Sequence, residues 1–110
     1  MKLELKIYKK DKKTVEKTYR ANAIELSFGT IRRTLQIIKP EELDLNDEQA
    51  LGRTLLGAWT MVEPLFTDIF PGLTAEELDR AKLPEMVRII RQVFAYLSEE
   101  IGRIGDSDPN

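Results

Sequence analysis

Apolar and charged residues alternate at the start of the chain, where charged side chains separate Leu3, Leu5 and Ile7. This period of two is typical of a strand with one buried face. A polar segment at 9–13 follows, and a second β-rich run occupies 14–20. The pattern therefore predicts an antiparallel hairpin at the N-terminus.

The next apolar residues, Ile24, Leu26 and Phe28, again fall on every second position, which allows a third short strand. An isolated two-stranded hairpin is only marginally stable in water, so its apolar face must pack on other elements. The helices predicted downstream are the candidates for this role.

Helical spacing begins where this segment ends. Ser27 can cap a helix N-terminus, and Pro40 ends the pattern about three turns later. The apolar stripe between these two residues has spacings of three and four, at Phe28, Ile31, Leu35 and Ile38. Residues 41–46 then form an acidic connector, and Asn46 or Asp47 can cap the next helix.

A second helix is predicted after this connector, with an apolar stripe at Leu51, Leu55, Ala58, Trp59 and Val62. Gly52 and Gly57 weaken this helix by roughly 1 kcal/mol each relative to alanine, unless they allow another backbone to approach closely. We expect Pro64 to kink or restart the helix, because proline lacks the N–H that a helix needs. The pair Pro71-Gly72 predicts its end.

Two further helices are indicated by their N-terminal signals. Thr74 and Glu77 have the spacing of a capping box, in which a hydroxyl and a carboxylate bond to free backbone N–H groups. Pro84 suits the first position of a helix, and the apolar period after it continues to about Ile104. Residues 105–110 are polar, and we expect them to form a disordered tail.

The order of these elements, strands first and helices after, predicts an α+β fold. It consists of an N-terminal antiparallel hairpin followed by four to five α-helices, of which the C-terminal one is longest. The chain of 110 residues is long enough for one domain with one hydrophobic core, and we assign that domain to 1–104.

The residue types restrict the chemistry that the protein can perform. The chain contains no cysteine and no histidine, so it has no thiol nucleophile, no disulfide and no imidazole to act as a base or metal ligand. The acidic pairs Glu41-Glu42 and Glu76-Glu77 are adjacent in sequence, and adjacent helix residues do not face each other. We therefore predict a binding protein and not an enzyme, with no catalytic residue, no cofactor and no metal site.

Charge is distributed unevenly along the chain, although the net charge is only -2. Residues 1–20 contain eight Lys or Arg and three Asp or Glu, whereas residues 41–79 contain ten Asp or Glu and a single Arg. Such segregation can steer a partner or orient copies of the chain head to tail, so self-association is one expectation. The alternative is that the lysines only solvate a hairpin and discourage pairing at its edges.

The last helix has more apolar surface than one neighbour requires. Its main seam has spacings of three and four, at Val87, Ile90, Phe94, Leu97, Ile101 and Ile104. A second strip lies beside it, at Met86, Ile89 and Val93. Either the hairpin and the Trp59 helix cover both strips, or part of this surface receives a helix from a partner. On the second hypothesis the partner-binding residues are Val87, Ile90, Phe94, Leu97 and Ile101, supported by Trp59 and Phe66.

The sequence also indicates where the protein acts. No apolar run typical of a signal peptide follows the N-terminus, and no stretch approaches the length of a membrane-spanning helix. We therefore expect a cytosolic protein that does not interact with membranes.

A DNA-binding function is the first alternative, because 74–81 followed by the helix from Pro84, with Arg88 and Arg91, loosely suggests a helix-turn-helix unit. Against this interpretation, the second helix is apolar where polar side chains would have to read bases. The acidic middle of the chain would also repel phosphate. We therefore expect no nucleic-acid partner.

Two separate segments resemble one known family, the tail assembly chaperones of long-tailed phages and prophages of Gram-positive bacteria. The opening MKLELKIYKKDKKTVEKTYRANAIELSFGTI is similar to the start of these proteins, where a lysine-rich hairpin precedes an LSFGT-like helix start, here 26–30. The segment PLFTDIFPGLTAEELDRAKLPEMVRIIRQVF is similar to a later stretch, where an IFPGLT-EEL turn, here 69–78, leads into a long C-terminal helix. The resemblance covers about residues 1–101.

This resemblance implies a non-enzymatic function in phage tail assembly. Such chaperones bind the long, aggregation-prone tape measure protein in the cytoplasm of the bacterial host, and they are absent from the mature virion. They also help to recruit tail tube protein, in many cases through a frameshift-extended form of the chaperone. The family has no single active residue to carry over to this chain. A structural virion component, such as a head–tail connector, is the second alternative.

Overall fold

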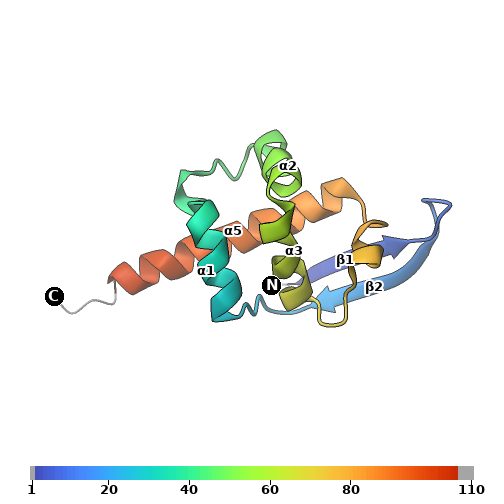
Figure 1. Ribbon diagram of the computed structural model, residues 1–110, viewed down its shortest axis with the longest axis horizontal. Helices are drawn as coiled ribbons and strands as arrows, with labels where there is room; N and C mark the ends of the chain where they lie inside the picture. The colour runs from blue at the N-terminus through green and yellow to red at the C-terminus, as the bar shows by residue number, and fades with distance from the viewer. Residues whose placement is uncertain (1, 107–110) are drawn as a thin grey trace.

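The computed structural model describes residues 2–106 and, of their side chains, those of 2–40 and 42–103 (Figure 1). It confirms the predicted α+β fold, a hairpin followed by five α-helices. The elements in chain order are β1 (Leu3–Tyr8), β2 (Val15–Ala21), α1 (Phe28–Ile37), the short 3-10 helix η1 (Pro40–Glu42), α2 (Glu48–Gly57), α3 (Trp59–Ile69), α4 (Ala75–Leu78) and α5 (Leu83–Asp106).

The hairpin forms as its alternation predicts. β1 and β2 pair antiparallel, with Leu5 opposite Tyr19, and the register shifts once between Ile7 and Tyr8. The three apolar residues of β1 are fully buried, whereas the positions between them are exposed. Asp11 stabilises the turn, because one of its carboxylate oxygens accepts hydrogen bonds from the Lys13 and Thr14 N–H groups, each at 2.9 Å.

The third short strand that the alternation allowed is not formed, since the sheet described by the structure has only β1 and β2. Ile24 is buried and Leu26 is half-buried, so the alternation reflects a segment that crosses the core without a strand partner. Phe28 does not belong to this segment, because it begins α1.

α1 begins and ends where predicted, but its buried face is shifted to one side of the predicted stripe, of which Ile31 and Ile38 are partly buried against the core. The Ser27 side chain accepts a hydrogen bond from the Thr30 N–H and caps the helix. The buried residues are Thr30 and Thr34, whose hydroxyl donates to the Thr30 carbonyl at 2.8 Å. Phe28, expected to lead the apolar stripe, is 77% exposed. Small hydroxyl residues with locally satisfied hydrogen bonds therefore lie deepest in the contact of α1 with the core, beside the partly buried Ile31 and Ile38.

The predicted second helix is divided in two, and the break lies at Ala58 rather than at Pro64. Ala58 has φ -122° and ψ 40°, which ends α2 after Gly57 and begins α3. Pro64 lies inside α3, and the Thr67 hydroxyl donates to its carbonyl at 3.2 Å. The weak helix former Gly57 thus marks the end of α2 more reliably than the proline does.

The segment after α3 follows its local signals. Gly72 has φ +92°, a left-handed conformation that favours glycine, and it turns the chain toward α4. Thr74 and Glu77 form the predicted capping box at the start of this one-turn helix. Asp47, the second of the two predicted caps, caps α2 by accepting from the Ala50 N–H.

α5 organises the core along the length of the molecule (Figure 1). It packs against α2, η1 and β1, while α1 packs against α3. The helix continues through Gly105 and Asp106, the first two residues of the predicted tail, and residues 107–110 of that tail lie outside the described part. Hairpin and helices thus share one core, as the marginal stability of an isolated hairpin requires.

Candidate partner-binding surface

Most of the partner-binding residues predicted from the sequence lie in the core. Phe66, Ile90 and Phe94 are fully buried, and Leu97 and Val87 are only 2% and 6% exposed. The second strip of α5 is buried as well. The apolar arc of α5 is wide because the helix contacts neighbours on several sides, so these five side chains do not form a free surface in the single chain.

The other two predicted residues lie at the surface, far apart on the chain. Ile101 is 37% exposed and lies near the C-terminal end of α5. Trp59 is half-buried, its indole N–H donates to Glu63 at 3.1 Å, and its ring lies 6.3 Å from the ring of Phe66. Trp59 therefore connects the core to the surface.

An apolar groove runs between α2 and the start of α5. It has a volume of about 450 Å³, and its walls include Gly52 and Leu56 from α2 and Leu83, Pro84 and Val87 from α5. Leu56 is 66% exposed and Leu83 is 42% exposed, and because both line the same hollow they belong to one apolar patch rather than to isolated surface positions. The groove is therefore an apolar surface that the chain itself leaves uncovered.

A second hollow of about 240 Å³ continues this surface. Leu56 and Leu83 line both hollows, and the second adds Trp59 and Ala81. We call the combined feature the α2–α5 groove, defined by Gly52, Leu56, Trp59, Ala81, Leu83 and Val87. It brings together two of the seven predicted residues, Trp59 and Val87, and separates them from Ile101.

Polar contacts hold the walls of the groove in place. Arg91 of α5 donates to the Leu45 carbonyl at 2.8 Å and to the Glu48 carboxylate at 2.9 Å. These bonds tie Leu45 and Glu48, the first residue of α2, to α5 and so anchor the N-terminal end of α2 against that helix. A surface that is fixed before binding loses less conformational entropy when a partner docks.

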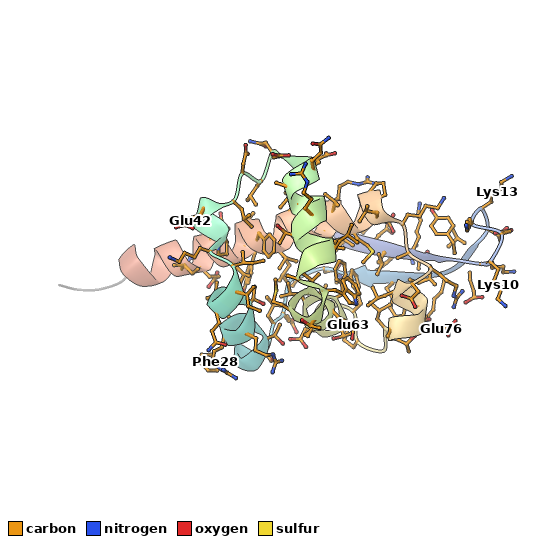
Figure 2. All side chains as sticks on the ribbon, turned by 45° about the horizontal axis from the view of Figure 1, so that its top comes forward. Lys10, Lys13, Phe28, Glu42, Glu63 and Glu76 are labelled. Carbon is orange, nitrogen blue, oxygen red and sulfur yellow. The ribbon has the colours of Figure 1, made fainter. Side chains whose placement is uncertain are left out.

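Leu56, Leu83 and the exposed Phe28 and Ile37 were not among the predicted site residues. For Leu56 a signal exists in the sequence: Leu51 and Leu55 already occupy the buried stripe of α2, and the residue next to Leu55 must point elsewhere. Figure 2 shows Phe28 at the outer end of α1. No comparable sequence signal identifies Phe28, because it continues the apolar period of its helix.

The geometry needed for a helix-turn-helix DNA reader is not found in the C-terminal half. α4 has four residues, less than the length of a supporting helix. At the start of α5 the apolar side chains Met86, Ile89, Ile90 and Val93 are buried, whereas Arg88 is exposed. Arg91 is half-buried and bonds to Leu45 and Glu48.

Two carboxyl groups with lowered pKa values, Asp11 and Glu77, have structural roles. The pKa of Asp11 is lowered to about 2, first by the hydrogen bond from the Thr14 hydroxyl and then by the Thr14 and Lys13 N–H groups. The pKa of Glu77 is lowered chiefly by the Tyr19 hydroxyl. Hydrogen bonds in the hairpin turn account for the lowered pKa of Asp11, and hydrogen bonds at the cap of α4 and to β2 account for that of Glu77. Within the described residues, no three acidic side chains converge in a way that could hold a metal ion.

No helix in the described part of the chain has both the length and the apolar character needed to cross a bilayer. Comparisons of the chain with models of protein families, with curated proteins and with solved structures gave no match.

Proposed function

We propose that the protein is a non-enzymatic binding protein, a tail assembly chaperone that binds the tape measure protein during phage tail morphogenesis. The observation that carries this proposal is the α2–α5 groove, where Leu56 and Leu83 stay exposed on a preformed apolar surface. Apolar side chains of a partner helix can pack into such a groove at regular helical spacing.

The kind of partner follows from the chemistry of this surface. A tape measure helix carries apolar residues that must be shielded until assembly, and an apolar groove on a highly charged domain shields them reversibly. The resemblance of 1–31 and 64–94 to tail assembly chaperones supplies the identity of that partner. Recruitment of tail tube protein through an extended form, action in the host cytoplasm and absence from the mature virion are parts of the same proposal.

Two alternatives receive less support from the fold. A DNA-binding regulator built on a helix-turn-helix unit would require a full supporting helix before its recognition helix, whereas α4 has only four residues. A head–tail connector would remain in purified particles, and detection of the protein there would favour that function. We favour the chaperone because the groove needs a partner that binds and later leaves.

The test is co-purification with the tape measure protein of the same phage or prophage, using Leu56→Asp and Leu83→Asp. Each places a charge on an apolar wall of the groove without emptying the core. Gln36→Asp is the matched control, because it also adds one negative charge at an exposed helix position, on α1. Circular dichroism and urea unfolding establish that all three variants are folded.

The proposal predicts that the two leucine variants lose the tape measure protein and that Gln36→Asp retains it. If both leucine variants are folded and retain the partner, the groove is not its binding site. If the wild-type chain does not bind the tape measure protein at all, the chaperone function itself is wrong.

A further inference from the structure

The outer edge of β1 faces α4 and α5 rather than β2. Near the hairpin tip the chain itself closes this edge, because the Tyr8 N–H donates to the Arg80 carbonyl at 3.2 Å and Arg80 Nη1 donates to the Tyr8 carbonyl at 2.9 Å. Farther along, the Lys6 N–H donates to the Glu85 carboxylate. Toward residue 2, the same edge opens onto a hollow.

This first hollow has a volume of about 310 Å³ and lies between residues 2–6 and the first turns of α5. Three cations line it: Lys2, Lys6 and Arg88. Its two acids are already engaged, since Glu4 pairs with Arg20 at 2.7 Å and Glu85 accepts from the Lys6 N–H. Among the side chains of 2–40 and 42–103, no salt bridge involves any of the three cations, so the cations outnumber the acids on this rim.

A neighbouring hollow of about 410 Å³ continues along the same edge of β1, between the hairpin tip and the turn before α5. Lys9, Lys10, Lys12 and Lys82 line it together with Tyr8, whose ring carries the Lys82 ammonium 4.5 Å from its centroid. Figure 2 shows Lys10 at the tip of the hairpin. Both hollows border one edge because the segments 79–82 and 85–92 follow each other beside β1.

We propose that this basic edge, defined by Lys2, Lys6, Lys9, Lys82 and Arg88, binds an extended acidic segment of a partner polypeptide. β1 spans about 20 Å, so an extended chain can lie along the cations, but because the Lys6 and Tyr8 N–H groups are already bonded its backbone can pair only before Lys6. The partner's carboxylates pair with the lysines, while its backbone pairs with the open end of the strand. The chain already contains an interaction of this kind, since the Glu85 carboxylate accepts a hydrogen bond from the Lys6 N–H of β1.

A polypeptide fits this edge better than a nucleic acid does. Asp79 lines one hollow and Glu85 lines the other. A peptide can place its carboxylates opposite the cations alone, whereas DNA presents a phosphate charge about every 1.7 Å and cannot avoid these acids. The inference does not depend on the α2–α5 groove, because none of the five residues that define the basic edge lines that groove.

The experiment uses the full chain and a fluorescent peptide of about ten residues that alternates Glu with Thr, long enough to match β1. A Lys–Thr peptide of the same length and a short DNA duplex are the comparison ligands. Affinity is measured by anisotropy at low and high salt, and the shifted backbone amides are mapped by NMR. The variant is Lys6→Glu/Arg88→Glu, and the matched control is Arg32→Glu/Arg33→Glu, the same charge change on exposed residues of α1.

We expect the acidic peptide to bind, to shift the amides of residues 2–8, and to bind about tenfold more weakly to Lys6→Glu/Arg88→Glu than to the control. Absence of binding to the folded wild-type chain overturns the proposal. So does equal binding by the two double variants. If the chain binds the duplex more tightly than the peptide, and this binding also depends on Lys6 and Arg88, the proposal is overturned in favour of a nucleic-acid partner.

Discussion

The Tyr19 hydroxyl donates a 2.6 Å hydrogen bond to the Glu77 carboxylate and so joins β2 to α4. Lys17 Nζ donates to the same hydroxyl at 2.8 Å and lies 3.7 Å from the second Glu77 oxygen. Glu77 also accepts from the Thr74 N–H at 3.1 Å as part of the capping box. A single carboxylate therefore holds the hairpin against the turn that leads into α5.

Replacing Tyr19 with phenylalanine should destabilise the fold by about 1 kcal/mol, because the ring stays in the core while the bond to Glu77 is lost. The matched control is Tyr96→Phe, at a half-buried tyrosine in α5, which should change the free energy of unfolding by less than about 0.5 kcal/mol. Urea unfolding at neutral pH measures both. Equal effects of the two substitutions would show that the Tyr19–Glu77 bond contributes little.

The same bond predicts a dependence of stability on acid. The pKa of Glu77 is lowered from its ordinary value of 4.5, first by the Tyr19 hydroxyl and next by the Thr74 N–H and Lys17. A carboxyl group whose pKa is lower in the folded state stabilises the fold above its ordinary pKa. That contribution disappears as the pH falls through the lowered value.

Stability should therefore decrease on acidification below about pH 4.5, and Glu77→Gln should make this decrease shallower. The pKa values of Glu4 and Asp11 are lowered too, so part of the acid dependence should remain in the variant. Urea unfolding at a series of pH values gives the slope for each protein. An unchanged slope in Glu77→Gln would exclude Glu77 as a source of the acid sensitivity.

The elements of the fold that can be predicted from the sequence are those determined by neighbouring residues. The caps at Ser27, Asp47 and Thr74 lie where expected, because a cap requires only a side-chain oxygen and backbone N–H groups within one turn. The alternation of β1 likewise records its single buried face. The break at Ala58 has only a weak local signal, the preceding Gly57, and Pro64, which carries the stronger signal, lies inside α3.

The candidate surface is less predictable, because it depends on which apolar residues the rest of the chain covers. Phe28 and Phe94 both follow helical spacing, yet one is 77% exposed and the other is fully buried. The difference arises because α5 is surrounded by other elements, whereas α1 packs on one side only, and Phe28 lies away from that side. Sequence periodicity identifies an apolar face, but only tertiary packing decides whether that face is core or interface.

This difference leads to a test that separates core from surface. Phe94→Ala should lower the free energy of unfolding by about 3 to 5 kcal/mol, because it opens a cavity at a fully buried site. Leu56→Ala should change it by less than about 0.5 kcal/mol, because that side chain is 66% exposed. For the same reason, an acidic residue at position 94 would report on unfolding rather than on partner binding. A large loss of stability in Leu56→Ala would show that the groove is closed in solution.

The two glycines of α2 separate stability from binding. A Cβ atom at Gly52 would lie 3.8 Å from Val87 Cγ2, an ordinary contact, and one at Gly57 would have nothing within 4 Å. Neither glycine is needed for a close backbone approach. Alanine at either position should therefore stabilise the protein by up to roughly 1 kcal/mol, more at Gly52, because Gly57 is the last residue of its helix.

Binding should distinguish the two substitutions, since Gly52 lines the α2–α5 groove and Gly57 does not. The added methyl group of Gly52→Ala narrows the groove beside Leu56, so it should weaken capture of the tape measure protein while raising stability. Gly57→Ala should raise stability and leave capture unchanged. Urea unfolding and co-purification of both variants measure the two effects. Equal capture by a stabilised Gly52→Ala and the wild type would mean that the partner does not reach the floor of the groove, and its contacts would then be confined to the exposed leucines.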